Sequence, residues 1–258
     1  MVPLLVAFAA LSCVVLGITI GLALRTVLPE THWKDDSRDI LKTSSGLIAT
    51  LVALVLGLLV ASAKGTFDAA GSSIMQTGAR FIALDRYLQD FGSEAEPIRV
   101  GLKRALRHGI ERMWPRQGHG DPDSYPMAHE LDDVYKAIVR LDPPTDAARK
   151  IQAQCVQVAN DLLLTRWQLV EQTQYELPRV FLVVLIFWLM VLFMVFGLLT
   201  PRNPTTVLAL FVCAVSVSAA IFLILELTHP FDGTIVVSSL PFEKALALMD
   251  THLSLIHI

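Results

Sequence analysis

The chain has 258 residues, of which 53% are hydrophobic and only 17% are charged. About a quarter of the residues in a soluble domain are charged, so this composition is typical of a membrane protein. The formal net charge of −3, from 21 basic and 24 acidic side chains, provides no basic excess for binding nucleic acid. The three cysteines lie far apart, which argues against a disulfide framework and the usual metal-ligand spacings.

The first apolar run, Val2 to Leu24, is long enough to cross a bilayer as a helix and is closed by Arg25. No basic residue precedes it within the chain and no clear small-residue cleavage site follows. We therefore expect a retained membrane span over residues 1–24 and not a cleaved signal peptide. A polar connection with four basic and four acidic side chains follows over residues 25–45.

Residues 46–63 carry no charge and are the second expected span. Thr50, Leu54 and Leu58 recur every four residues, so they share one face of this helix. Small residues along the span favour close packing against neighbouring helices. They are Gly46, Ala49, Ala53, Gly57 and Ala61. Lys64 then marks the point where the helix meets water.

Residues 64–179 form a polar insert whose apolar residues keep a helical period in two heptad-like seams. The seams are Phe67, Ile74, Phe81 and Leu88 with Ala70, Thr77, Leu84 and Phe91, and later Ile151, Val158, Thr165 and Gln172 with Ala148, Cys155, Leu162 and Leu169. The first long helix is expected to continue the second span without a break, and the last to run into the third span near Pro178. Two shorter helices are expected over Ile98–Trp114 and Met127–Leu141. No strand pattern of any length occurs.

Residues 180–199 and 205–227 are the third and fourth expected spans. The predicted fold is thus an all-α membrane protein with four transmembrane helices and a helical extramembrane insert between the second and third. A C-terminal segment follows over residues 228–252. The last six residues, 253–258, read as the translation of an adapter used in sequencing libraries, so we expect the natural chain to continue differently after His252.

Two stretches of the chain resemble the bestrophin-like family of bacterial and plant membrane proteins. The first is GLIATLVALVLGLLVASAKGTFD, residues 46–68, which contains Gly57 and Asp68. The second is LELTHPFDGTIVVSSLPFEKAL, residues 225–246. Members of the family show an acidic residue, then Pro-Phe and Gly, then a Ser-rich strip. In this chain these are Glu226, Pro230, Phe231, Gly233, Ser238 and Ser239.

The family is linked to true bestrophins, which are pentameric anion channels with four spans per subunit and a pore lined by the second span. In bestrophins, a stretch of the second span that contains Val-Leu-Gly carries the three apolar residues of the pore neck. Aligning this stretch with Val55-Leu56-Gly57 places the neck at Thr50, Leu54 and Leu58. The resemblance therefore implies a homo-oligomer, by analogy a pentamer, in a lipid bilayer with small anions as the permeant partner. This chain differs in having a Thr/Leu/Leu neck instead of a mainly aromatic one, and in lacking an acidic cluster typical of a calcium clasp.

The orientation also rests on the resemblance, because the positive-inside count is nearly balanced between the two sides. By analogy with bestrophins, the insert and both termini are expected in the cytoplasm. We expect the protein in a bacterial inner membrane.

Each candidate residue also has a structural interpretation. The Thr50, Leu54 and Leu58 face either gates a pore by dewetting or simply packs and meets lipid. Lys64 either forms a ring of positive charge in an oligomer or extends from the helix end to the membrane interface. Glu226 either pairs with His229, caps the 234–239 segment, or lies at the membrane interface.

The sequence gives little support for an enzyme or for a metal site. No nucleophile elbow, Walker loop or dinucleotide fingerprint occurs, so we predict neither an enzyme nor a bound cofactor. His108, His119 and His129, with Asp121 and Asp123, lack the ligand spacing of zinc or EF-hand sites and favour a solvated loop over a metal site. Two functions remain: an anion channel lined by the second span, or a non-conducting membrane-anchored scaffold or sensor whose insert binds a partner through its seams.

Overall fold

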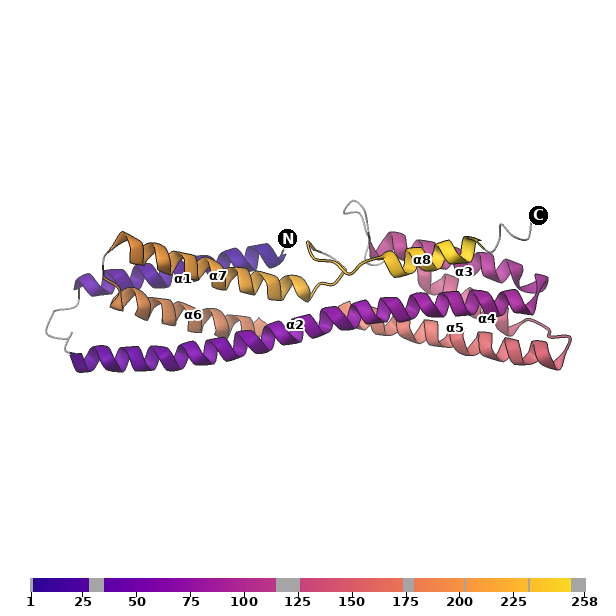
Figure 1. The fold of residues 1–258 in the computed structure, drawn as a ribbon, viewed down its shortest axis with the longest axis horizontal. Helices are drawn as coiled ribbons and strands as arrows, with labels where there is room; N and C mark the ends of the chain where they lie inside the picture. Colours follow the sequence, from indigo (N-terminus) through magenta and orange to yellow (C-terminus); the bar gives the residue numbers. More distant parts are fainter. Residues whose placement is uncertain are drawn as a thin grey trace. The chain divides into compact units, whose positions relative to one another are not determined.

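The computed structural model describes residues 2–27, 35–114, 126–173, 179–201, 203–231 and 233–251. Within these ranges every regular element is a helix, which confirms the predicted all-α fold (Figure 1). The chain divides into two compact units. Residues 1–67, 175–229 and 233–235 form the bundle unit, and residues 68–174, 230–232 and 236–258 form the helical unit.

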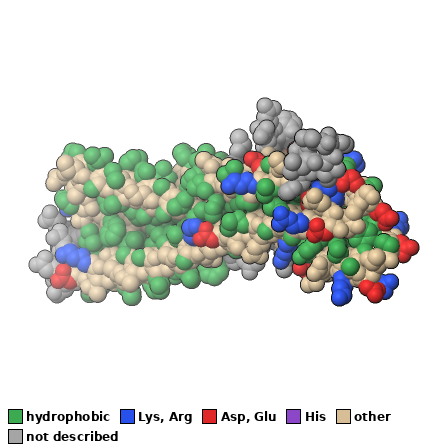
Figure 2. All heavy atoms as spheres, turned by 45° about the vertical axis from the view of Figure 1, so that its right-hand side comes forward, with side chains coloured by type: hydrophobic (Ala, Val, Ile, Leu, Met, Phe, Trp, Pro, Cys, Tyr) green, Lys and Arg blue, Asp and Glu red, His purple; other side chains and the backbone are tan. Residues whose placement is uncertain are grey.

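The bundle unit contains α1 (Val2–Val27), the first part of α2 (Asp35–Phe91), α6 (Arg179–Leu199) and α7 (Pro204–Leu227). All four helices are long and apolar enough to cross a membrane. Helices α1, α6 and α7 begin and end within three residues of the predicted spans. Figure 2 shows hydrophobic side chains over the visible face of this unit, as expected for a surface that meets lipid.

Glycines allow α1 and α6 to approach each other closely. A Cβ atom added at Gly17 would lie 2.5 Å from the carbonyl oxygen of Met190, and one at Gly197 would lie 2.6 Å from that of Ile18. A Cβ atom at Gly21 would collide with the backbone of α6 as well. Such contacts supply the van der Waals attraction that holds membrane helices together where lipid removes the hydrophobic driving force. The α1–α6 crossing therefore depends on these three glycines.

Helix α2 runs without a break from Asp35 to Phe91, as the sequence predicted. Between Lys42 and Lys64 it carries 21 uncharged residues. At 1.5 Å per residue this segment is about 32 Å long, close to the thickness of bilayer hydrocarbon. One side of the segment, with Val52, Leu59 and Ala63, packs into the core of the bundle unit.

The helical unit contains the rest of α2, the short 3-10 helix η2 (Ser93–Ala95), α3 (Glu96–Met113), α4 (Pro126–Val139), α5 (Asp146–Thr173) and α8 (Leu240–Thr251). Helices α3 and α4 begin and end within two residues of the two predicted shorter helices. The predicted seams supply its core, because Ile74, Phe81, Leu84 and Leu88 of α2 and Cys155 and Leu162 of α5 are buried. Burial raises the pKa of the Cys155 thiol to about 11.

A buried ion pair fastens α3 to α2. Asp85 and Arg99 are 3% and 1% exposed, and Arg99 donates from Nε to Oδ1 of Asp85 at 2.9 Å and from Nη2 to Oδ2 at 3.1 Å. Its Nη1 donates to Oε2 of Glu96 at 2.9 Å. Burial disfavours the cation, but the hydrogen bonds and charges of Asp85 and Glu96 outweigh it and raise the pKa of Arg99. Arg99 therefore stays protonated, and it contacts Asp85 through two hydrogen bonds.

Parts of three predictions lie outside the described residues. They are the loop with His119, Asp121 and Asp123, the junction near Pro178, and the six residues 253–258.

Replacing Gly17 by Ala is expected to lower the unfolding temperature of the purified protein in detergent. The new Cβ atom cannot fit against Met190 unless α1 and α6 separate, an overpacking cost of about 1–3 kcal/mol. Gly101→Ala in α3 is the matched control, since its Cβ atom would make only an ordinary contact at 3.5 Å from Cγ2 of Val134 and Ala favours the helix by about 0.5–1 kcal/mol. Equal unfolding temperatures for the two variants would contradict the close approach.

Asp85→Asn is expected to destabilise the helical unit by about 3–5 kcal/mol, because it leaves the Arg99 cation buried without its bidentate partner. Hydrogen exchange of the α3 amides measures this loss of protection. The control is Asp146→Asn, which breaks a solvent-exposed pair with Arg149 and should change nothing measurable. Unchanged α3 protection in Asp85→Asn would show that the buried pair does not hold α3.

Candidate functional site

The face of α2 with Thr50, Leu54 and Leu58 is left uncovered by its own protomer. Leu54 and Leu58 are each 69% exposed, and Thr50 is exposed with its hydroxyl donating to the carbonyl oxygen of Gly46 at 2.9 Å. The opposite side of the same segment is buried. The structure thus places the three predicted neck residues together on the outward side of the bundle unit.

Four small residues on the outward side of α2 do not pack inside the protomer, in contrast to the glycines of α1 and α6. A Cβ atom added at Gly46 or Gly57 would meet no neighbouring heavy atom within 4 Å. Ala53 and Ala61 are exposed as well. Any close helix packing that these residues serve must therefore involve something outside this protomer.

The exposed surface of α6 has a different composition. Its outward residues are large and apolar: Val180, Phe181, Val183, Val184 and Phe187. This is the surface expected against lipid chains, whereas the outward face of α2 alternates leucine with Gly, Ala and Thr. The exposed residues of α2 and α6 therefore differ in composition.

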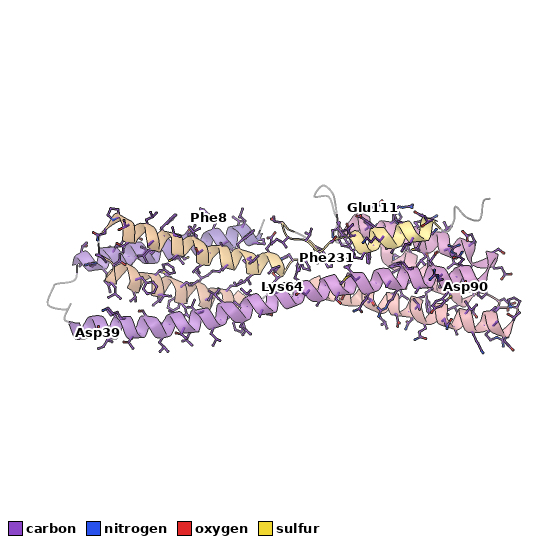
Figure 3. The ribbon with its side chains drawn as sticks, viewed as in Figure 1. Phe8, Asp39, Lys64, Asp90, Glu111 and Phe231 are labelled. Carbon is purple, nitrogen blue, oxygen red and sulfur yellow. The ribbon has the colours of Figure 1, made fainter. Side chains whose placement is uncertain are left out.

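Lys64 ends the uncharged segment of α2. Its Nζ lies 5.9 Å from the centroid of the Phe67 ring, within the range of a cation–π contact. Asp68 follows one turn later, and both side chains are exposed. Figure 3 shows Asp39 and Lys64 along α2, on either side of the uncharged stretch. A basic residue thus stands at the end of the face that carries Thr50, Leu54 and Leu58.

A cavity of about 190 Å³ lies between α2 and α6 within the bundle unit. It is lined by Val55, Val180, Phe181, Val184, Leu185 and Trp188. No charged side chain lines it and the surface that it exposes is apolar, so it is not suited to hold an anion.

Glu226 lies in the last turn of α7 and is only 3% exposed. Its Oε1 accepts a hydrogen bond from the backbone N–H of Thr234, so the carboxylate ties the following turn to the helix end. Gly233 makes this possible, because its φ of +145° suits glycine and a Cβ atom there would lie 2.6 Å from Oε1 of Glu226. His229 instead has its Nδ1 2.9 Å from the carbonyl oxygen of Leu225. Of the three interpretations, the geometry favours the cap.

The rest of this motif packs in the helical unit. Pro230 accepts a backbone hydrogen bond from Val237 at 2.8 Å, and the ring of Phe231 meets that of Trp114 edge to face at 6.0 Å between centroids. Trp114 also donates from Nε1 to the carbonyl oxygen of Val237 at 2.6 Å and packs on Phe242. The Pro-Phe element of the motif is therefore an anchor for the chain between α7 and α8.

Sequence reasoning missed Trp114 and Phe242. A tryptophan at the end of an amphipathic helix does signal a buried ring whose N–H needs an acceptor. The sequence pattern could not identify that acceptor, because it is the carbonyl oxygen of Val237, 123 residues further along the chain. Lys103 was missed for the same reason: it is buried, donates to the carbonyl oxygen of Met249 and so holds α8.

The described residues include no cluster of three or more His, Cys, Asp or Glu side chains suited to a metal ion. His108 contacts Glu130 instead, with Nδ1 and Oε1 2.7 Å apart, which links α3 to α4.

The four apolar helices and the helical unit define a helical membrane protein. A model of the Bestrophin-like domain matches residues 10–242, and the chain therefore belongs to the bestrophin-like family. The match includes residues 46–68 and most of 225–246, the two stretches on which the resemblance was based. No curated protein and no solved structure matches the chain.

Gly233→Ala is expected to break the Glu226–Thr234 hydrogen bond and to speed hydrogen exchange of the Thr234 amide. The matched control is Gly92→Ala, which has the same kind of positive φ, +114°, but no neighbouring atom within 4 Å of its Cβ position. Backbone strain should cost both variants about 1–3 kcal/mol, while only Gly233→Ala also displaces Glu226. Slow exchange of Thr234 in Gly233→Ala would contradict the cap.

Proposed function

We propose that this protein is a homo-oligomeric anion channel whose pore is lined by α2, with Thr50, Leu54 and Leu58 as its neck. The observation that carries the proposal is the uncovered face of α2, built of small and apolar residues, in a chain of the bestrophin-like family. By analogy with bestrophins the assembly is a pentamer. The four apolar helices cross a bacterial inner membrane, and the helical unit lies in the cytoplasm.

The chemistry of the face suits a gate. A ring of Leu54 and Leu58 side chains carries no charge, so it neither repels an anion nor binds it tightly, and it can close by expelling water. Lys64 would repeat around the axis as a ring of positive charge at the end of the pore, which raises the local anion concentration.

The difference between α2 and α6 supports a pore over a face that only meets lipid. A helix that faces lipid alone gains nothing from Gly46, Ala53, Gly57 and Ala61, whereas a helix packed around an axis needs small residues for close approach. Within the protomer these positions contact little, so a neighbouring copy is the natural partner.

The scaffold alternative rested on the two heptad-like seams. Their described members are mostly buried inside the helical unit, with Ile74, Leu84 and Leu162 among its core residues. These seams are therefore occupied by internal packing and not presented to a partner.

Anion flux into liposomes tests the proposal. Leu54→Ala/Leu58→Ala should raise the flux severalfold, because a wider and less apolar neck stays wet. Val183→Ala/Phe187→Ala, which shortens two exposed side chains on α6, is the control and should leave the flux unchanged. Absence of flux from a well-folded oligomer, or the same response in both double variants, would overturn the pore.

The mass of the protein in detergent gives an independent check. A ring with α2 at its centre requires at least three or four copies, and the family analogy gives five. A protein that stays a monomer or a dimer under conditions that preserve its fold would exclude this pore.

A further inference from the structure

The cavity between α2 and α6 follows one side of α6. Five residues of α6 line it, at positions i, i+1, i+4, i+5 and i+8 of the helix: Val180, Phe181, Val184, Leu185 and Trp188. This spacing places them on one side of α6 over about 12 Å of its length. Val55 of α2 completes the lining. The cavity is therefore elongated, and it runs from the first turn of α6 toward the middle of the helix.

The lining residues become more buried along this path. Val180 and Phe181, near the start of α6, are 72% and 58% exposed. Leu185 is 1% exposed, and Trp188 is half-buried. An occupant can therefore enter from the outside of the bundle unit near the start of α6 and reach inward as far as Trp188.

Helix α6 packs tightly against α1, but a space remains between it and α2. Toward α1, its backbone leaves no room for a Cβ atom at Gly17 or Gly21. Toward α2, the cavity has a volume of about 190 Å³. An engineered cavity of about 150 Å³ with apolar walls stays dry and holds a benzene molecule. The cavity between α2 and α6 is thus large enough for an apolar group, and its walls favour such a group over water.

We propose that this cavity binds one acyl chain of a membrane phospholipid. Its lining residues Val180, Phe181 and Val184 belong to the same exposed apolar surface of α6 as Val183 and Phe187. The surface expected against lipid therefore continues into the cavity, and lipid chains are the apolar groups that surround a membrane helix.

The bound chain fills a space that the side chains of α2 and α6 leave between them. Because lipid tails are as apolar as the cavity walls, the chain gains little from the hydrophobic effect. It gains dispersion contacts with wall atoms that otherwise have no partner on that side. The phospholipid thereby joins α2 to α6 within one protomer. This inference does not depend on the proposed pore.

Fluorescence quenching of Trp188 tests the site, because bromine atoms on an acyl chain quench an indole ring that they contact. The full chain is kept in a sterol-based detergent, which has no flexible chain to compete, and is titrated with phosphatidylcholine brominated in its acyl chains. Quenching should saturate at one phospholipid per protomer. The chain has four tryptophans, and the difference between wild type and Trp188→Phe isolates the signal of Trp188.

Two substitutions fill the cavity from opposite walls. Val55→Phe on α2 and Val184→Phe on α6 should each abolish the saturable quenching. Val183→Phe is the matched control, because it adds the same volume to α6 at a side chain that is 66% exposed and does not line the cavity. Unfolding temperatures give a second readout. Phospholipid should raise the unfolding temperature of wild type and Val183→Phe, and leave those of the two filled variants unchanged.

A tryptophan outside the cavity distinguishes a binding site from the lipid around any membrane helix. In Val183→Trp/Trp188→Phe, quenching should rise with added phospholipid without saturating. Unsaturable quenching of Trp188, or the same titration curve for both tryptophans, would overturn the site. Saturation that survives both filling substitutions would place the chain elsewhere and overturn it as well. Saturable quenching by a brominated free fatty acid, but not by the phospholipid, would refute a phospholipid as the occupant.

Discussion

The continuity of α2 is the constraint on which the rest of the structure depends. A single helix of 57 residues contributes its first part to the core of the bundle unit and the rest to the core of the helical unit. In the helical unit, the buried side of α2 is held by Phe81, Leu84 and the Asp85–Arg99 pair. In the bundle unit, it is held by Val52, Leu59 and Ala63. In each unit, other residues of α2 remain exposed, such as Leu54 in the bundle unit and Gln76 in the helical unit.

Five glycines within the apolar helices of the bundle unit fall into two groups with different consequences. Gly17, Gly21 and Gly197 bring the backbones of α1 and α6 together and leave no room for a side chain. Gly46 and Gly57 of α2 face open space. The first group stabilises the protomer by close packing, where lipid offers no hydrophobic driving force. The second group makes no close contact within the protomer, which supports the proposal that α2 packs against neighbouring copies.

Much of the fold was predictable because it depends on local patterns. Uncharged runs located four helices long and apolar enough to cross a membrane, and the heptad spacing identified Ile74, Phe81 and Leu162 as core residues. The spacing also put Thr50, Leu54 and Leu58 on one face, but it did not show that the protomer leaves this face uncovered. Contacts between distant segments, such as Trp114 with Val237 and Lys103 with Met249, have no local signal, because only the tertiary fold brings these residues together.

The most direct test of the account is the reactivity of single cysteines on α2 toward a small, charged thiol reagent that does not enter lipid. Cysteines at Thr50 and Ala61 should react in the assembled protein in liposomes, because a pore keeps this face in contact with water. Cysteines at Val183 and Phe187 on α6 should not, because these side chains meet lipid. Reaction at neither set in a well-folded oligomer would place the outward face of α2 in lipid and contradict the central claim.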